Sequence, residues 1–208
     1  GTYLRRQFLH PLDPKRREQL QSIIALASSE ELMDPKFPVL INELQKKQIP
    51  VIGFTALEVG VYGKIANLEN WRLNQLKKLG IDFSSTFCKI NLTVFPNMSA
   101  YNGKHPLFKD GVFFTNRQSK AEALMALITQ LDWTPKKIVF VDDTLEHIRA
   151  VEAVANRLGV EYVGLHYQAA SLTPCGFDQK RGEFQFQHLL EYDEWLTDSA
   201  ATLRIQNQ

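Results

Sequence analysis

The stretch Lys136-Lys137-Ile138-Val139-Phe140-Val141-Asp142-Asp143-Thr144 decides how the rest of the chain is interpreted. Its four central residues are β-branched or aromatic, which predicts a strand buried on both faces. Apolar residues then recur at helical spacing from Ile148 to Leu158, and Gly159 stands where a helix would end. The two carboxylates are therefore expected at the carboxyl end of a strand, where open parallel α/β sheets bind ligands.

Two functions are open for this acidic pair. Adjacent carboxylates repel each other, and a hard cation such as Mg²⁺ takes oxygen ligands of this kind. Alternatively, Asp143 or Thr144 caps the following helix, because a short polar side chain satisfies the free N–H groups there. The other motifs of the chain are needed to distinguish metal binding from helix capping.

Composition narrows the class of protein. The 208 residues suffice for one α/β domain with an appendage. The net charge of +1 disfavours a nucleic-acid binder, and no apolar run reaches the length of a membrane span. We therefore expect a soluble protein. Its localisation stays open, because residues 1–6 lack a signal-peptide core and the sequence does not begin with Met.

Strand and helix patterns alternate along the middle of the chain. Strands are expected within residues 49–56, 111–115, 138–141 and 160–165, with helices between them, which predicts an α/β fold with a mainly parallel sheet. Residues 81–110 are expected to form an irregular loop. The periodicity weakens after residue 171.

Polar groups follow these strands in a fixed order. Thr55 ends one strand pattern, Lys120 stands in the first turn of a helix opened by Ser119, and Asp142-Asp143 ends another strand. A hydroxyl donor, a cation and a metal-holding acidic pair are what phosphoryl transfer needs, since its catalysis is mostly positioning and charge neutralisation. The helix dipole disfavours a cation in the first turn, so Lys120 is expected to face an anion.

The order and spacing of these motifs resemble the haloacid dehalogenase (HAD) superfamily, over roughly residues 38–170. The matching stretches are Val51-Ile52-Gly53-Phe54-Thr55, Ser119-Lys120 and Val139-Phe140-Val141-Asp142-Asp143. The chain is most similar to a little-characterised bacterial HAD-like subfamily. The resemblance implies a Rossmannoid three-layer α/β/α core over residues 38–175, a helical cap remnant over 1–37 and a tail over 176–208 packed on the core.

The resemblance also implies an activity, that of a Mg²⁺-dependent phosphatase acting on a small phosphomonoester through an aspartyl-phosphate. Thr55 and Ala56 would bind the phosphoryl group, Lys120 would neutralise its charge, and Asp142 with Asp143 would hold Mg²⁺. Glu146 would be an outer contact. His147 stands four residues after Asp143, and we expect it at the surface.

One motif of the superfamily is missing from the sequence. Its nucleophile lies in an Asp-x-Asp that follows an apolar strand, and residues 1–54 contain no such motif. We therefore expect the nucleophile before Gly1, on a strand that lies between those ending in Thr55 and Asp142. The 208 residues alone are expected to be inactive.

The alternative is a catalytically inactive HAD-like domain that binds a ligand or partner, which the missing nucleophile favours. Two other folds are disfavoured. A response-regulator receiver would place its acidic pair before the Thr and Lys, whereas here the pair comes last. A dinucleotide-binding fold would need a glycine-rich turn after its first strand, and the sequence has none. The sequence identifies neither the substrate nor the oligomeric state.

Overall fold

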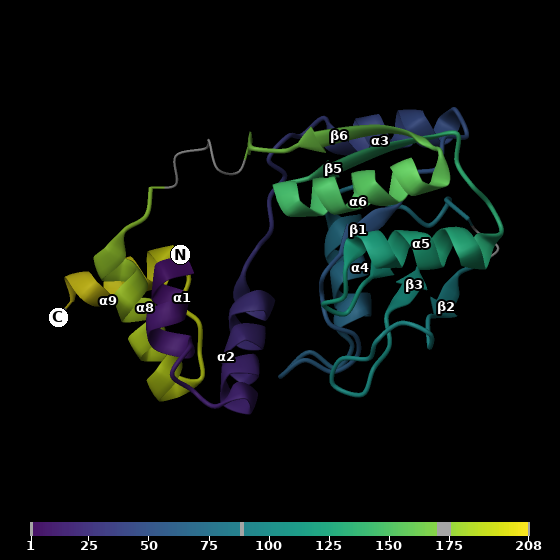
Figure 1. The fold of residues 1–208 in the computed structure, drawn as a ribbon. Coiled ribbons are helices and arrows are strands. Elements are labelled where there is room, and N and C mark those ends of the chain that lie inside the picture. Colours follow the sequence, from purple (N-terminus) through teal and green to yellow (C-terminus); the bar gives the residue numbers. More distant parts are fainter. Residues whose placement is uncertain (1, 88–89, 170–175, 208) are drawn as a thin grey trace. The chain divides into compact units, whose positions relative to one another are not determined.

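The computed structural model describes residues 2–87, 90–169 and 176–207. Its contacts divide the chain into two units, one of residues 1–31, 61–68 and 174–208 and the other of residues 32–60 and 69–173. We call them the helical unit and the α/β unit, and Figure 1 shows the elements of each. Each is described by itself below.

The helical unit joins the two ends of the chain. Its helices are α1 (Thr2–Leu9), α2 (Pro14–Ala27), α8 (Gln179–Tyr192) and α9 (Asp198–Gln206). Asp13 caps α2 by accepting a hydrogen bond from Arg16 N at 3.0 Å. The buried apolar side chains come from both ends of the sequence and form one core, namely Leu4, Leu9, Leu20, Ile24, Phe186 and Leu189. Phe186 and Leu189 belong to the C-terminal segment, which we expected as a tail packed on the α/β core, and in the structure they share a core with the N-terminal helices.

The α/β unit contains the remaining elements. Its helices are α3 (Phe37–Lys46), α4 (Leu68–Lys78, whose first residue belongs to the helical unit), α5 (Lys120–Leu131) and α6 (Leu145–Leu158). Its strands are β1 (Gly53–Thr55), β2 (Leu92–Val94), β3 (Leu107–Lys109), β4 (Val112–Phe114), β5 (Lys137–Asp142) and β6 (Glu161–His166).

The strands form two sheets, so the fold is mixed α/β. One sheet has the order β1-β4-β3-β2, with β1 and β4 parallel and the other pairs antiparallel. The second contains β5 and β6 in parallel. Helix α6 packs on this pair and beside α5 (Figure 1). The α/β class that we expected is confirmed, whereas the described strands form two small sheets instead of one mainly parallel sheet.

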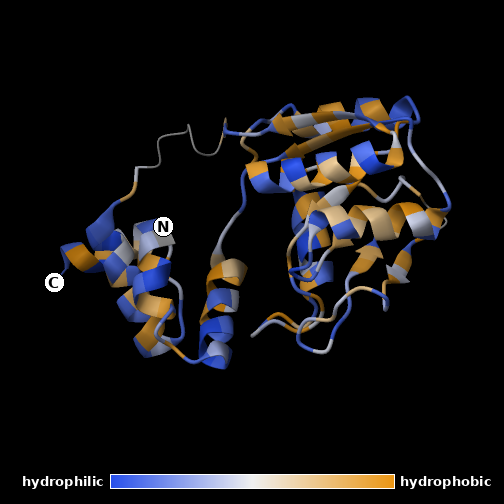
Figure 2. Ribbon diagram, in the orientation of Figure 1, coloured by the Kyte–Doolittle hydropathy of each residue, from blue (hydrophilic) through white to orange (hydrophobic). Residues whose placement is uncertain are grey.

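Local signals around the acidic pair predict the structure well. Strand β5 ends at Asp142, and α6 ends at Leu158 with Gly159 as its C-cap residue, whose φ of 68° is left-handed. The expected cap of α5 is confirmed, because Ser119 Oγ accepts from Glu122 N. Figure 2 shows hydrophilic and hydrophobic residues alternating along α6, as its buried face requires.

The expected burial of β5 on both faces is wrong. Val139 and Val141 of β5 are 56% and 50% exposed, and Leu165 of β6 is 49% exposed. Only the other face of β5, with Ile138 and Phe140, packs on the helices. Within the described residues, β1 and β5 are both edge strands. Each has one side without a neighbouring strand.

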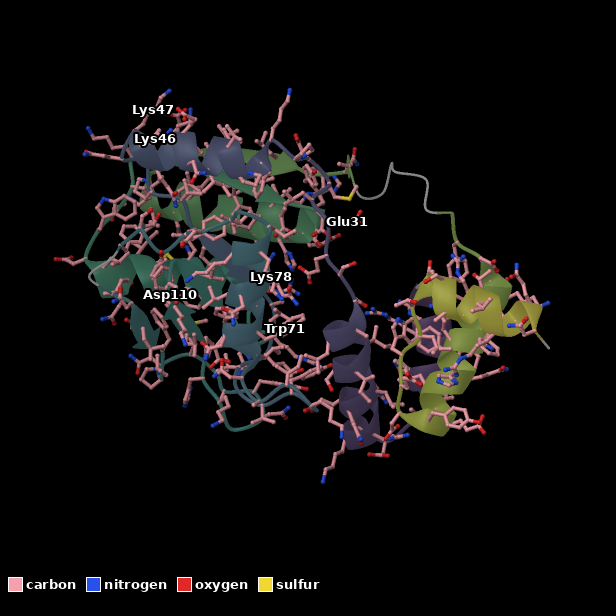
Figure 3. All side chains as sticks on the ribbon, turned by 180° about the vertical axis from the view of Figure 1, so that it is seen from behind. Glu31, Lys46, Lys47, Trp71, Lys78 and Asp110 are labelled. Atoms are coloured by element: carbon pink, nitrogen blue, oxygen red, sulfur yellow. The ribbon has the colours of Figure 1, made fainter. Side chains whose placement is uncertain are left out.

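Polar residues occupy helix ends and turns of the α/β unit. Lys46 and Lys47 lie at the carboxyl end of α3 (Figure 3), where cations interact favourably with the helix dipole.

None of the helices in the described part of the chain combines the length and the apolar character of a membrane span.

Candidate functional site

A buried ion pair joins the first turn of α5 to the carboxyl end of β5. Lys120 Nζ lies 2.5 Å from Asp142 Oδ2, and the two side chains are only 14% and 3% exposed. Lys120 is the first residue of α5, and Asp142 is the last residue of β5. The anion that the position of Lys120 predicted is therefore Asp142 itself.

The second carboxylate oxygen of Asp142 holds the start of α6. Oδ1 accepts a hydrogen bond from Thr144 N at 2.9 Å, and Nδ1 of His147 lies 3.1 Å from the same oxygen. Thr144 is the N-cap residue of α6, but its side chain makes no capping hydrogen bond. Asp142 thus connects the N-termini of α5 and α6, and His147, expected at the surface, contacts it.

The environment of Asp142 favours its ionised form. Burial alone would raise the pKa of the carboxyl group. The hydrogen bonds from Lys120, Thr144 N and His147 outweigh this effect, so the pKa of Asp142 is lowered. The carboxylate is therefore charged at neutral pH and compensated mainly by Lys120.

Asp143 differs from its neighbour in environment. It is exposed, and its Oδ1 accepts from Thr144 Oγ1 at 3.3 Å. Nothing in the described ranges brings three or more His, Cys, Asp or Glu side chains together as a metal site. Mg²⁺, however, is commonly held by one or two carboxylates together with substrate phosphates and water. Asp143 fits such a site, whereas Asp142 is already bonded to three donors.

Thr55 and Ala56 lie at the carboxyl end of the neighbouring sheet. Thr55 O accepts from Thr115 N at 2.8 Å, and Ala56 O accepts from Arg117 N at 3.1 Å. These bonds tie the end of β1 to the segment that leads into Lys120. In the part of the chain described, no hydrogen bond joins Thr55 to Lys120 or Asp142. The rings of Phe54 and Phe140 meet edge to face at 6.5 Å, which connects β1 to β5.

Asn116 was missed by the sequence analysis. Its side chain is 1% exposed, donates to the carbonyls of Tyr101 (3.1 Å) and Lys104 (2.7 Å), and accepts from Val59 N at 3.2 Å. Its φ of 49° is left-handed, a conformation that Asn tolerates better than most residues. Asn116 therefore fastens two other loops to the segment between β4 and α5.

Arg117 follows in the same turn and extends this cluster. It is ion-paired with Glu58 at 2.5 Å, and its guanidinium lies 4.6 Å from the ring centre of Tyr101. Asn116 and Arg117 are two consecutive non-Gly residues with left-handed φ. Apart from the Asn itself, nothing in the sequence predicted this conformation. Both residues lie between Thr55 and Lys120 in the sequence.

Comparison with known proteins gives a family for this chain. The profile of a family described as "Protein of unknown function (DUF2608)" matches residues 11–202. The chain belongs to the DUF2608 family. The match extends into both units and includes α8 and the first part of α9.

Similar curated proteins come from Rickettsia and are described as uncharacterised proteins. The chain is 31% identical over 140 residues to one from Rickettsia bellii and 29% identical over 140 residues to one from Rickettsia felis, covering 66% of the chain each time. A protein of Rickettsia typhi is 29% identical over 146 residues, or 69% of the chain. These alignments cover 48–50% of the relatives, so the chain spans about half their length. No solved structure matches it.

The membership corrects the resemblance drawn from the sequence. The matching family is DUF2608, and no signature of the haloacid dehalogenase superfamily is found in this DUF2608 chain. The motifs behind that resemblance were a Thr, a Lys and two Asp at element ends. Such residues also serve to cap helices and form ion pairs, and the Lys120–Asp142 pair is an example.

Proposed function

We propose that the ends of β1 and β5 bind a phosphoryl group, and that the complete protein is a Mg²⁺-dependent phosphatase of small phosphomonoesters. One observation carries this proposal, namely the buried contact between Lys120 and Asp142 at the N-termini of two helices. Helix N-termini favour anions because their N–H groups are free and the dipole is positive there. A lysine at the same place adds the charge that phosphate needs.

Each proposed side chain has a defined role. The Thr55 hydroxyl and the Ala56 N–H donate to phosphoryl oxygens, and Lys120 neutralises their charge. Asp142 keeps Lys120 in position, and Asp143 is the main carboxylate for Mg²⁺, with Asp142 beside it. When bound, Mg²⁺ supplies further neutralisation of the phosphate charge.

The nucleophile in this proposal is an Asp outside residues 1–208, since the sequence has no Asp-x-Asp before Thr55. Its carboxylate oxygen bonds to phosphorus while the bond from phosphorus to the alcohol oxygen breaks. The leaving oxygen takes a proton from a general acid. Water then hydrolyses the aspartyl-phosphate, which releases inorganic phosphate and restores the carboxylate.

A second candidate is a catalytically inactive binding domain. Both oxygens of Asp142 already have partners in Lys120, Thr144 and His147, which is also what a purely structural ion pair would show. In that case Lys120 stabilises the fold and never contacts phosphate.

The deciding experiment has two parts. Inorganic phosphate with Mg²⁺ is titrated into the 208-residue chain, and NMR shifts of Thr55, Ala56 and Lys120 are followed. Hydrolysis of p-nitrophenyl phosphate is then measured for this chain and for a longer parent protein. We expect shifts at all three residues, no turnover by the 208 residues, and turnover by the parent.

Variants separate the two candidates. Lys120→Ala should lower turnover by orders of magnitude, whereas Lys137→Ala removes a surface lysine paired with Glu161 and should leave turnover unchanged. Near-normal turnover in Lys120→Ala would show that Lys120 has only a structural role and does not contact phosphate. No phosphate shifts together with no turnover by the parent would support the inactive domain. Hydrolysis by the 208 residues that Asp143→Ala abolishes would place the nucleophile within this chain.

A further inference from the structure

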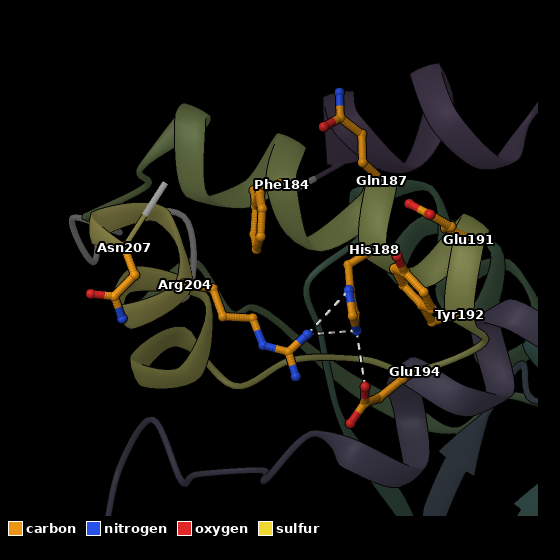
Figure 4. A pocket seen from close by; sticks show the side chains of 8 residues that line it. All are labelled: Phe184, Gln187, His188, Glu191, Tyr192, Glu194, Arg204 and Asn207. Carbon is orange, nitrogen blue, oxygen red and sulfur yellow. Dashed lines mark hydrogen bonds and ion pairs between the residues drawn. The ribbon is translucent and has the colours of Figure 1, made fainter.

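The helical unit contains a pocket between α8 and α9, with a volume of about 670 Å³. Its size is in the range of small-molecule sites. The residues that matter for its chemistry are shown in Figure 4 and are Phe184, His188, Glu191, Tyr192, Glu194 and Arg204. None of them belongs to the network around Asp142.

The carboxylates of this pocket already have partners. His188 Nε2 lies 2.9 Å from Glu194 Oε2, with the imidazole 7% exposed and the carboxylate 60% exposed. The hydrogen bond from His188 lowers the pKa of Glu194 and outweighs the opposite effect of desolvation. Glu191 interacts with the Tyr192 hydroxyl. These acidic groups are therefore committed within the protein.

Arg204 keeps most of its hydrogen-bonding capacity. Its Nη1 lies 3.5 Å from His188 Nδ1 and 3.4 Å from His188 Nε2 (Figure 4). Since Nε2–H donates to Glu194, Nδ1 is the acceptor that faces the guanidinium. Between residues 176 and 207, no carboxylate lies within ion-pair distance of Arg204, although the charge of Arg204 acts on Glu194 from farther away. Its remaining N–H groups are available to an anion, and a guanidinium suits a planar carboxylate.

An apolar wall accompanies the guanidinium. Phe184 precedes His188 by four residues, so the two side chains share one face of α8. The ring of Tyr192 lies 4.6 Å from the imidazole, centre to centre. Figure 4 shows the Phe184 ring and the Arg204 guanidinium on the same side of His188. A flat apolar group placed there would bring an attached carboxylate to Arg204.

We propose that this pocket binds a small aromatic carboxylate, with the ring against Phe184 and the carboxylate on Arg204. The proposal is independent of phosphate chemistry in the α/β unit. Arg204 disfavours a cation at the place of the carboxylate, and a ligand without charge would add no partner for the guanidinium there.

The test uses benzoate, benzyl alcohol and benzylamine, which share a ring and differ in charge. Binding to the 208-residue chain is measured by saturation-transfer NMR and by shifts of the Arg204 side chain. We expect saturable binding of benzoate, at least tenfold weaker binding of benzyl alcohol, and none of benzylamine. Equal binding of benzylamine and benzoate, or no saturable binding of benzoate, would overturn the proposal.

Two variants and a control assign the contacts. Arg204→Gln should weaken benzoate at least tenfold and abolish its advantage over benzyl alcohol. Phe184→Leu retains the guanidinium and should weaken benzoate but not acetate. Arg6→Gln changes an exposed arginine on α1 of the same unit and should have no effect. Equal losses in Arg204→Gln and Arg6→Gln, with circular dichroism showing both folded, would mean that only overall charge attracts benzoate.

Discussion

Lys120 and Asp142, 22 positions apart in the sequence, meet at 2.5 Å between the first turn of α5 and the end of β5. Both side chains are largely buried. Removing one member of such a pair leaves an uncompensated charge, and this costs more than the pair itself contributes. The contact therefore matters for stability whether or not phosphate binds beside it.

The first prediction is a strong energetic coupling between these two residues. Lys120→Met and Asp142→Asn should each lower the free energy of unfolding by about 3 kcal/mol, because each leaves its partner buried without compensation. The double variant should lose less than the sum, by about 1 kcal/mol or more. Urea unfolding of the four proteins measures this.

The surface pair Lys137–Glu161 provides the control for this cycle. Its side chains are 48% and 64% exposed at a distance of 2.6 Å, so its coupling should stay below about 1 kcal/mol. Similar coupling in the two pairs would show that burial does not strengthen the Lys120–Asp142 contact.

The second prediction concerns pH. The folded-state pKa of Asp142 is lowered, despite burial, by its hydrogen bonds to Lys120, Thr144 and His147. A lowered pKa stabilises the fold above the unfolded value of about 4, and this stabilisation is lost as the pH falls through the folded value. The difference in unfolding free energy between wild type and Asp142→Asn should therefore shrink as the pH falls below about 4. Carboxylates elsewhere titrate in both proteins, so their contributions to this difference cancel. A difference that does not change between pH 6 and pH 3 would contradict the lowered pKa.

Sequence reasoning predicted the elements around the acidic pair because their signals are local. The apolar run before Asp142, the serine before Lys120 and the glycine after Leu158 each act on their own segment. It missed β2 and β3, which we had expected to be loop. The turn between β3 and β4 is Asp110-Gly111, with φ of 46° and 77°, and Asp-Gly between apolar residues is a strong hairpin signal. That signal was present in the sequence and was not used.

The burial of the strands could not be predicted from their own residues. The run from Ile138 to Val141 is apolar at every position, yet only Ile138 and Phe140 pack on helices. Whether a second layer covers Val139 and Val141 depends on distant parts of a protein. The same holds for Asn116, because its three partners lie in two loops distant in the sequence.

The third prediction concerns Asn116 as the fastener of three loops. Asn116→Ala removes three buried hydrogen bonds, so it should lower the free energy of unfolding by about 3 kcal/mol. Val59 N loses its partner, whereas the carbonyls of Tyr101 and Lys104 keep the backbone hydrogen bonds that these two residues exchange. Asn102→Ala is the matched control, since Asn102 has a similar φ of 51° but is exposed and makes one bond, to Glu58. We expect a loss below about 1 kcal/mol there. Equal losses in urea unfolding would mean that the left-handed backbone, and not the buried amide, determines the effect.

The last prediction concerns the unpaired sides of β1 and β5. In a parallel ladder alternate residues bond to the neighbouring strand, and Lys136 O and Asp142 O bond to the β6 segment. The backbone groups of Val139 and Val141 consequently point away from β6, toward the side where the described residues offer no strand. Their side chains are exposed as well. An exposed apolar edge of this kind is a template for pairing with another strand.

We expect a longer parent chain to supply that strand, between β1 and β5, together with the nucleophile of the proposed phosphatase. Hydrogen exchange tests it amide by amide. In the 208-residue chain the amides of Val139 and Val141 should exchange quickly, whereas those of Ile138 and Phe140, bonded to β6, should be protected. In the parent all four should be protected, because a strand would then bond to both sides of β5. Fast exchange of Val139 and Val141 in the parent would show that β5 remains an edge, and the nucleophile would then have to reach Asp143 from a loop.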